Sequence, residues 1–286
     1  MRCSVVERGV FRFGSHTLRT EHLKGDLPLI QTELLELAQQ AARDAGEVLQ
    51  SWRKRFTVRE KGPADLVTEA DEAAQRTIHE LIHSRFPDHK FLGEEGLSRT
   101  AGDSPYHWII DPLDGTSNYV HGYPYYAVSI GLECDEELLV GVIYDPTRDD
   151  MFTATRGGGA ALNNCAIHTS SVAELSQAML VASFPPGVRP EHPAIARFLR
   201  VLPHAQTIHR TGSAALNLAY LAAGRIEAFW SGSLKPWDMA AGVLIVREAG
   251  GRVTRMDGTA LDLHVPDLLS SNGSAIHEEL QKRLAE

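Results

Sequence analysis

Residues 108–116 read WIIDPLDGT, and this stretch is the most informative in the chain. The apolar run 108–110 is typical of a buried strand, and two carboxylates, Asp111 and Asp114, follow it. Pro112 has no N–H and a fixed φ, so we expect the strand to end at Asp111 and the chain to turn. Two carboxylates about 4 Å apart repel by roughly 4 kcal/mol at an effective dielectric of about 20. Such a pair needs a cation, and oxygen ligands at an open turn suit Mg²⁺.

The composition is that of an ordinary globular protein. The chain has 286 residues, 43% hydrophobic and 23% charged, which suits one large domain or two fused halves. Its formal net charge of −9 argues against a general nucleic-acid surface. The three cysteines are widely spaced without a CxxC pair, which favours a reducing, cytoplasmic location over a zinc site or a disulfide framework. No apolar run approaches the length of a membrane span.

The first 28 residues differ from the rest of the chain, because they show little helical or strand periodicity. Their arginines are Arg2, Arg8, Arg12 and Arg19. No apolar core or small-residue cleavage site marks a secretory signal, and Glu7 and Glu21 argue against a transit peptide. We interpret residues 1–28 as a disordered extension or as the result of a start codon placed too far upstream.

From residue 29 to about residue 170, the hydrophobic pattern predicts two helices followed by strands. Apolar residues recur at three- and four-residue steps in the helices, and the later strands form an antiparallel hairpin with one added strand. The predicted helices cover 28–52 and 68–85, and the predicted strands 91–92, 108–110, 125–133, 138–145 and 151–155. We expect 29–170 to be an N-terminal α+β half that carries most of the metal ligands.

Beyond Ser170 the pattern changes to an alternation of strands and helices. The predicted strands are 179–183, 226–230 and 252–256, and the predicted helices are 192–202, 213–223 and 237–249. Alternation of this kind indicates layered sheets and helices, so the fold class is mixed, α+β with α/β. We expect 171–286 to be a C-terminal α/β half that completes the active site.

Further acidic positions could join the two aspartates of the 111–114 bend, and each also has an ordinary structural explanation. Glu94 and Glu95 lie between two glycines, where such a pair is most often a solvated turn. Asp238 lies at a predicted helix start, where an acid interacts favourably with the helix dipole. Asp71 lies three residues after Thr68, which predicts a capping box. All these positions end a strand or start a helix, so their joint occurrence favours a shared metal site.

Gly115 and Thr116 directly follow the bend. A glycine allows close backbone approach, and free N–H groups at a helix start bind phosphate oxygens. The Thr116 hydroxyl could orient a water, although a simple turn with a threonine N-cap is also compatible. The glycines of 156–159 lack the lysine and hydroxyl residue of a P-loop, so they predict a hairpin turn. The 13 histidines show no metal-ligand spacing.

Four separated blocks of sequence carry a family resemblance that spans almost everything after about residue 29. They read DLVTEAD (65–71), GEEG (93–96), WIIDPLDGTSNYVHGYPYYAVSIGL (108–132) and KPWDMAAGVLIVREAGG (235–251), supported by GSAALNLAYLAAG (212–224). In this order they resemble the inositol monophosphatase family of Mg²⁺-dependent, lithium-sensitive sugar phosphatases. The resemblance implies a layered α-β-α-β-α sandwich and a homodimer, and the sandwich agrees with the element order above.

The resemblance also implies which residues bind metal and act on water. The implied ligands of two or three Mg²⁺ are Glu94, Asp111, the backbone carbonyl of Leu113, Asp114 and Asp238. Asp71 and Thr116 would orient the attacking water, which the ion held in part by Glu94 would activate. The implied reaction is in-line hydrolysis of a small phosphate monoester, inositol 1-phosphate by default, without a protein nucleophile.

Substrate contacts are implied for a second set of residues. The amides of Gly115 and Thr116 would hold the phosphate, Ser213 and Ala214 would line the alcohol pocket, and Lys61 would lie near the third ion. One position departs from the family pattern: inositol-selective members carry a glutamate seven residues before the last aspartate, and here that position is Ser231. The resemblance therefore supports phosphatase chemistry more strongly than it supports selectivity for inositol.

Alternatives of two classes stay open. A relative that acts on histidinol phosphate or a sugar bisphosphate is compatible with Ser231. Enzymes for nucleotide 3′-phosphates typically continue DGT with lysine, whereas Ser117 and Asn118 follow here. A regulatory scaffold with this fold but without turnover is the alternative of another class, and the intact set of acids argues against it.

Overall fold

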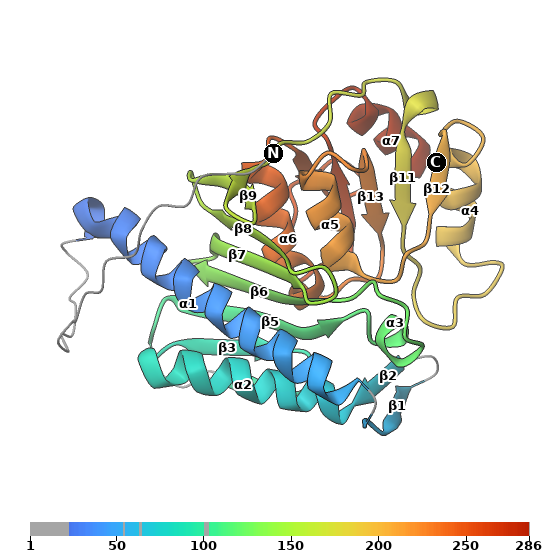
Figure 1. The fold of residues 1–286 in the computed structure, drawn as a ribbon. Helices are drawn as coiled ribbons and strands as arrows, with labels where there is room; N and C mark the ends of the chain where they lie inside the picture. The colour runs from blue at the N-terminus through green and yellow to red at the C-terminus, as the bar shows by residue number, and fades with distance from the viewer. Residues whose placement is uncertain (1–22, 54, 63–64, 100–102, 286) are drawn as a thin grey trace.

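The protein is built from five layers of alternating helices and sheets (Figure 1). The computed structural model describes residues 23–53, 55–62, 65–99 and 103–285. In order through the molecule, the layers are a helix pair, a large sheet, a second helix pair, a smaller sheet and a third helix pair. The pairs are α1 (Leu23–Trp52) with α2 (Glu69–Arg85), α5 (Ala214–Ala222) with α6 (Pro236–Glu248), and α4 (Pro193–Val201) with α7 (Ile276–Ala285). This confirms the predicted layered α-β-α-β-α class.

The large sheet has eight strands in the order β10-β9-β8-β7-β6-β5-β3-β4. Its strands are β3 (Lys90–Gly93), β4 (Ser98–Arg99), β5 (Tyr106–Asp114), β6 (Ala127–Cys134), β7 (Glu137–Asp145), β8 (Asp150–Thr155), β9 (Gly159–Leu162) and β10 (Cys165–Ala166). All neighbours are antiparallel except β3 and β5, which run parallel. The predicted hairpin and its added strand are confirmed as β6, β7 and β8, and the glycine-rich turn of 156–159 joins β8 to β9.

The smaller sheet has five strands in the order β12-β11-β13-β15-β14. They are β11 (Met179–Ala182), β12 (Thr207–His209), β13 (Ala228–Ser231), β14 (Arg252–Thr254) and β15 (Leu268–Ser271). The 3₁₀ turn η1 (Leu175–Gln177) leads into this sheet, and a separate hairpin of β1 (Val58–Gly62) and β2 (Asp65–Thr68) precedes α2. Within the part of the chain that the structure describes, the large sheet takes no strand from beyond residue 166, and the smaller sheet takes none from before residue 179. The division into halves at Ser170 stays a prediction.

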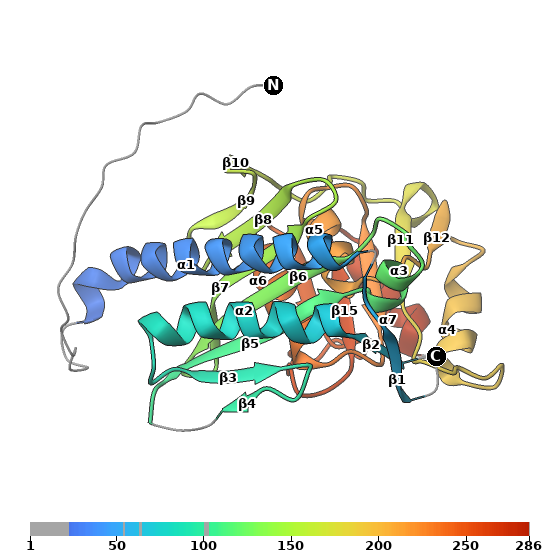
Figure 2. The ribbon, with the colours of Figure 1, turned by 60° about the horizontal axis from the view of Figure 1, so that its bottom comes forward.

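Apolar side chains fill the spaces between the layers. In β5, Trp108 and Ile110 pack toward α1 and α2, whereas Ile109 packs toward α5 and α6, as the two-residue period of a strand requires. Both faces of β5 are covered, which explains why 108–110 is a continuous apolar run. Figures 1 and 2 show α1 and α2 side by side on one face of this sheet.

Two glycines of the large sheet bring α6 close to it. A Cβ at Gly131 would lie 2.8 Å from the Cβ of Ala240, and a Cβ at Gly141 would lie 2.6 Å from the Ala241 carbonyl oxygen. These contacts require small residues, because any larger side chain would push the helix away. They fix the depth of α6, the helix whose first turn carries Asp238.

The expectation that the strand ends at Asp111 is wrong. Strand β5 continues to Asp114, and its pairing with β6 shifts from Asp111–Ser129 to Asp114–Ala127. Three steps along β5 thus match two along β6, which is a β-bulge. Pro112 is tolerated there because a bulge removes the need for its missing N–H. The strand is bent rather than ended, and both carboxylates stay on it.

The first helix begins earlier than predicted. Helix α1 starts at Leu23 and passes through Pro28, which removes only one bond of the helix ladder. Residues 23–28 are therefore helical rather than part of an extension, and the rest of the predicted extension, 1–22, lies outside the described residues. The sequence analysis did not predict β1, β2, β4, β9, β10, β12, β15, η1, α7 or the short helix α3 (Thr116–Val120). Most of these are too short to show a hydrophobic period.

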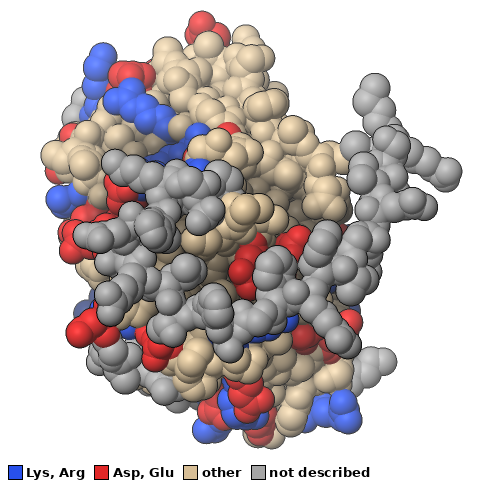
Figure 3. Space-filling view, turned by 90° about the vertical axis from the view of Figure 1, so that its left-hand side faces the viewer, with Lys and Arg blue, Asp and Glu red and all other residues tan. Residues whose placement is uncertain are grey.

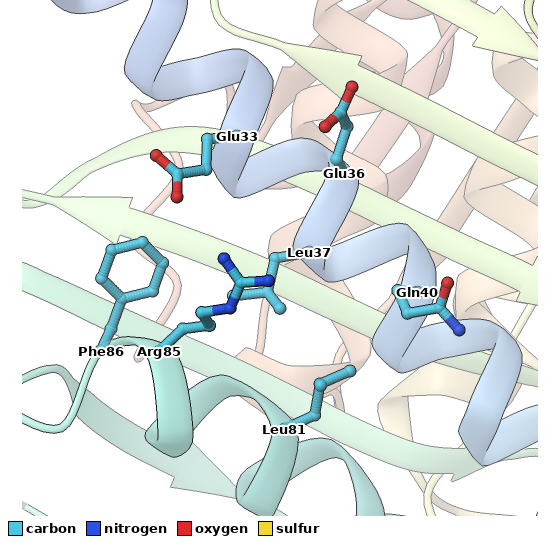
Figure 4. Close-up of a pocket in the computed structure, with 7 residues that line it drawn as sticks. All are labelled: Glu33, Glu36, Leu37, Gln40, Leu81, Arg85 and Phe86. Carbon is cyan, nitrogen blue, oxygen red and sulfur yellow. The ribbon is translucent and has the colours of Figure 1, made fainter. Parts of the chain in front are cut away.

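No helix in the described residues is long and apolar enough to cross a membrane. On the face shown in Figure 3, acidic and basic side chains are interspersed where the surface is coloured. A cavity of about 200 Å³ lies between α1 and α2, where Glu33, Leu37, Leu81, Arg85 and Phe86 line it (Figure 4). It contains none of the predicted site residues.

Candidate metal centre

Three aspartates from two layers converge at the end of β5. Asp111 and Asp114 lie on either side of the bulge, and Asp238 lies in the first turn of α6. Each offers a carboxylate oxygen, and these oxygens all lie within 4.8 Å of one another. Asp111 is 1% exposed, Asp114 is 8% exposed and Asp238 is half-buried. The structure therefore brings Asp238 close to the two aspartates of the 111–114 bend, as the sequence predicts.

Burial and mutual repulsion make these acids unusually hard to ionise together. Burial raises the pKa of Asp111 well above its ordinary 3.8, and the charges of Glu94, Asp114 and Asp238 raise it further. Burial also raises the pKa of Asp238 well above 3.8, with Asp114 as the next cause, and the pKa of Asp114 to about 6. A nearby positive charge would therefore favour the charged form of all three carboxylates.

The donor set fits a divalent cation. Among the described residues, no Lys, Arg or His forms an ion pair with any of the three aspartates. The group contains carboxylate oxygens and neither sulfur nor imidazole. Oxygen-only sets of this kind suit Mg²⁺, Ca²⁺ or Mn²⁺ rather than Zn²⁺. The residues that are present therefore fit a Mg²⁺-like ion.

Glu94 lies near this group but is not one of the three residues whose carboxylate oxygens lie within 4.8 Å of one another. It starts the turn between β3 and β4, and its charge raises the pKa of both Asp111 and Asp238. Gln75 of α2 fixes the same turn, since its amide exchanges two hydrogen bonds of 3.1 Å with the backbone of Glu95. The GEEG turn is thus anchored to α2 rather than solvated and free. Gln75 is not predicted as a site residue from the sequence, because it carries no motif signal.

Asp114 is held by the N-terminus of α5. The Ser213 hydroxyl and the Ala215 N–H both donate to its Oδ2, the latter at 2.8 Å, and the Ala214 N–H donates to its Oδ1 at 3.2 Å. Ser213 is 1% exposed and is also the N-cap of α5. The family resemblance implies that Ser213 and Ala214 line the alcohol pocket. In the structure, they and the unpredicted Ala215 fix the orientation of a predicted metal ligand.

Asp71 and Thr116 form the predicted pair. The Thr116 hydroxyl lies 3.3 Å from Asp71 Oδ1 and 3.1 Å from the Leu113 carbonyl oxygen. Asp71 Oδ2 accepts from the Thr68 N–H at 2.9 Å and from the Thr68 hydroxyl at 2.6 Å, which confirms the predicted capping box. Burial raises the pKa of Asp71 to about 6, and the nearby charge of Glu95 also raises it. The same carboxylate therefore caps α2 and faces Thr116.

The backbone at Gly115 requires glycine. Its φ is +95°, and a Cβ there would lie 3.0 Å from the Tyr125 carbonyl oxygen. This conformation turns the chain directly from the end of β5 at Asp114 into α3, which begins at Thr116.

The two remaining predicted residues have different outcomes. Ser231 ends β13 and is fully buried; its hydroxyl lies 3.3 Å from that of Ser233 and accepts from the Ser233 N–H at 3.4 Å. Lys61 lies in β1, and its side chain lies outside the described residues. A second cavity, of about 270 Å³, is bordered by Tyr125, Thr211 and Arg225 and contains none of the three aspartates. The candidate site is therefore identified by its group of acidic residues and not by the volume of a cavity.

Comparisons with known proteins show the family to which the chain belongs. A sequence model of the inositol monophosphatase family matches residues 30–286. An inositol-1-monophosphatase of Synechocystis sp. is 43% identical over 88% of this chain and 88% of its own length. A protein named Nus factor SuhB of Haemophilus influenzae is 40% identical over 87% of this chain and 95% of its own. The solved structure of the extragenic suppressor protein suhB of Bartonella henselae has a TM-score of 0.85 and 37% identity, covering 89% of this chain and 99% of that one. The chain therefore belongs to the inositol monophosphatase family, a family of phosphatases.

Proposed function

We propose that this protein hydrolyses a small phosphorylated polyol or sugar in a Mg²⁺-dependent reaction, with inositol 1-phosphate as the reference substrate. The observation that carries the proposal is the convergence of Asp111, Asp114 and Asp238 within 4.8 Å beside the Asp71–Thr116 pair. A relative 43% identical over most of the chain is named an inositol-1-monophosphatase, which supports the choice of substrate.

The acids would hold two or three divalent ions. Glu94, Asp111 and the Leu113 carbonyl would hold one, and Asp111, Asp114 and Asp238 would share another. When bound, a divalent ion supplies Lewis acidity, which lowers the pKa of a water and neutralises charge on a phosphate or leaving oxygen. The carboxylates of the chain supply the charge that retains the ions, and the hydrogen bonds from α5 keep Asp114 in place for this.

The proton of the attacking water would pass to Asp71. Its pKa of about 6 makes it a better proton acceptor than an ordinary aspartate and leaves it ionised at neutral pH. Thr116 would orient the water, since its hydroxyl lies between Asp71 and the Leu113 carbonyl oxygen. The amides of Gly115 and Thr116 would hold the phosphate, and no side chain needs to become phosphorylated.

The alcohol is the least determined part of the proposal. Ser231 is uncharged, fully buried and hydrogen-bonded to Ser233, so it offers no carboxylate to ring hydroxyls. Hydrolysis of histidinol phosphate or of a sugar bisphosphate is therefore the second candidate. Relatives named Nus factor SuhB make a non-catalytic regulatory role the candidate of another class. We propose a homodimer and inhibition by lithium from the family resemblance alone, and a cytoplasmic location from the cysteine pattern.

The test is phosphate release by the purified protein at increasing Mg²⁺. The substrates are inositol 1-phosphate, histidinol phosphate, fructose bisphosphate, glycerol 2-phosphate and a nucleotide 3′-phosphate. We expect the highest kcat/KM for a monophosphorylated polyol and no release with a chelator present. Asp111→Asn is expected to abolish release while the protein stays folded, with Asp257→Asn, at an exposed turn, as the matched control. Release that persists in Asp111→Asn, or that ignores the chelator, contradicts the proposal.

A further inference from the structure

The side chain of Asn118 joins two segments that are 86 residues apart in the sequence. Asn118 lies in α3, two residues after Thr116. Its Nδ2 donates to the Tyr125 carbonyl oxygen at 2.7 Å and to the Thr211 carbonyl oxygen at 2.9 Å. Tyr125 precedes β6, and Thr211 precedes α5. One amide group therefore connects the large sheet to the start of the second helix layer.

The backbones around this amide are closely packed. A Cβ at Gly115 would lie 3.0 Å from the Tyr125 carbonyl oxygen and 3.3 Å from the Gly212 carbonyl oxygen. A Cβ at Gly212 would lie 3.0 Å from Asn118 Nδ2. The turn after Asp114 and the segment before α5 thus meet directly, and the Asn118 amide lies at their junction.

The segment that Asn118 holds is the one that holds Asp114. Thr211 is two residues before Ser213, whose hydroxyl donates to Asp114, and the Ala214 and Ala215 N–H groups donate to the same carboxylate. A shift of this segment would change the direction of all three donors. Loss of the Asn118 amide would also leave two carbonyl oxygens without this donor, which favours such a shift.

We propose that Asn118 is a positioning residue of the metal centre: by fixing 211–215 to the bend, it sets the orientation of Asp114 for the ion. The inference rests on the metal site of the proposed function. It concerns a side chain that, like Ala215, would touch neither ion nor substrate.

A second contact between the same segments does not depend on Asn118. Asn217 Oδ1 accepts from the Thr211 hydroxyl at 2.6 Å and from the Tyr125 hydroxyl at 3.0 Å. Tyr125 and Thr211 therefore stay joined through Asn217. For this reason we expect Asn118 variants to displace the α5 start rather than to unfold the protein.

The experiment measures Mn²⁺ affinity directly, from the EPR signal of the free ion, in the full-length protein without substrate. Mn²⁺ suits because it prefers the same oxygen ligands as Mg²⁺. In Asn118→Asp, which keeps the size but removes both N–H donors, we expect affinity to fall about 10-fold, as typical for a lost outer-shell contact. The Mg²⁺ concentration for half-maximal activity should rise in parallel, with a smaller change in kcat at saturating Mg²⁺.

Asn272→Asp is the matched control. The Asn272 amide likewise donates to two backbone carbonyl oxygens, of Ser170 at 3.2 Å and of Val172 at 2.7 Å, and also to the Ser170 hydroxyl at 3.0 Å. Asn272 directly follows the last residue of β15, whereas the first residue of β15, Leu268, pairs with Ser231. We expect Asn272→Asp to lower the melting temperature and to leave Mn²⁺ affinity unchanged. A loss of affinity as large as that of Asn118→Asp would assign the effect to general destabilisation and overturn the inference.

Two further measurements keep the outcome clear. Asn118→Ser, whose short hydroxyl cannot reach both carbonyl oxygens, replaces Asn118→Asp if that variant does not fold, and the same 10-fold loss is expected. Unchanged affinity in a folded Asn118 variant overturns the inference. Wild-type protein that binds Mn²⁺ but releases no phosphate overturns the proposed activity and leaves this inference standing. Wild-type protein that binds no Mn²⁺ overturns both.

Discussion

Helices α2 and α6 begin in the same way, yet we propose different chemistry for their first turns. In each, an aspartate three residues after the N-cap accepts a hydrogen bond from the N-cap N–H: Thr68 to Asp71 at 2.9 Å, and Lys235 to Asp238 at 2.7 Å. Both acids stabilise the helix start through the dipole and the unsatisfied N–H groups. By local rules alone, the two positions are equivalent.

Their neighbours make them different. Asp71 also accepts from the Thr68 hydroxyl and faces Thr116, so hydrogen bonds oppose its desolvation and its pKa rises only to about 6. Asp238 has one such bond and faces Asp114, so its pKa rises well above 3.8. We therefore propose that Asp71 acts as a proton acceptor and Asp238 as a metal ligand, because different layers pack against two similar capping acids.

Among changes at the two helix starts, the largest expected effect is that of Asp238→Asn. It removes one charge from the ion site, so we expect kcat/KM to fall at least about 1,000-fold, equivalent to about 4 kcal/mol of barrier. Because asparagine keeps an oxygen for the Lys235 N–H and relieves repulsion, the metal-free protein should melt at a higher temperature than wild type. Phosphate release and differential scanning calorimetry check both parts. A lower melting temperature would show that the cap, not the charge cluster, dominates at this position.

The stability of the metal-free protein is expected to fall as pH rises. Asp71 and Asp114 have folded pKa values of about 6, above the ordinary 3.8, so the folded state binds more protons than the unfolded state between these values. Stability is fully present below about pH 4 and is lost as pH rises through about 6, by roughly 3 kcal/mol from the fully buried Asp71 alone at about 1.36 kcal/mol per pKa unit. Denaturant unfolding in chelator from pH 4 to 8 measures this. Saturating Mg²⁺ should oppose the loss, and a flat profile in chelator would contradict the electrostatic account.

Asp71→Asn is expected to lower kcat without lowering ion affinity, and so to differ from Asp238→Asn. Without the carboxylate the proton acceptor is lost, and we expect kcat to fall about 100-fold, the lower range for general-base catalysis. Ion affinity should stay near wild type, in contrast to Asp238→Asn, because Asp71 is not part of the group of three. Kinetics and Mn²⁺ binding on the same samples make the comparison. Equal loss of ion affinity in both variants would remove the distinction between their roles.

The smallest effects are expected at the N-cap residues themselves. Thr68→Ala removes a hydroxyl that contacts Asp71 and the Ala70 N–H, and we expect a loss of about 1 kcal/mol in the free energy of unfolding. Lys235→Ala keeps the backbone N–H that caps Asp238, and Lys235 is exposed, so the change should stay within about 0.5 kcal/mol. Urea unfolding of both variants tests this. A larger cost for Lys235→Ala would mean that its side chain, not only its backbone, stabilises the first turn of α6.

Periodicity predicted most of the long elements, including α2, β6, β7 and α6, because their apolar faces are covered along their whole length. It failed for β12 and β15, which are short and take their pairing from distant strands. The bulge at Pro112 could not be predicted, because it depends on the register with β6.

The same division holds for the site. Asp111 and Asp114 were predictable because they share one motif, and the four ordered blocks indicated Glu94, Asp71 and Asp238 by resemblance. The support from Gln75, Ala215 and Asn118 was not predictable, because an amide side chain or a backbone N–H carries no pattern of its own.

By itself the sequence determined which acidic residues are available, where most long helices and strands lie, and that Asp111 and Asp114 flank a bend at Pro112. Only the tertiary structure decided that Asp238, more than 100 residues away, completes the group, because Gly131 and Gly141 let α6 approach the sheet closely. The physical reason is the distance along the chain over which each effect acts. Capping, turning and periodicity act over a few residues, whereas repulsion among buried carboxylates exists only after packing has removed water and brought the charges together.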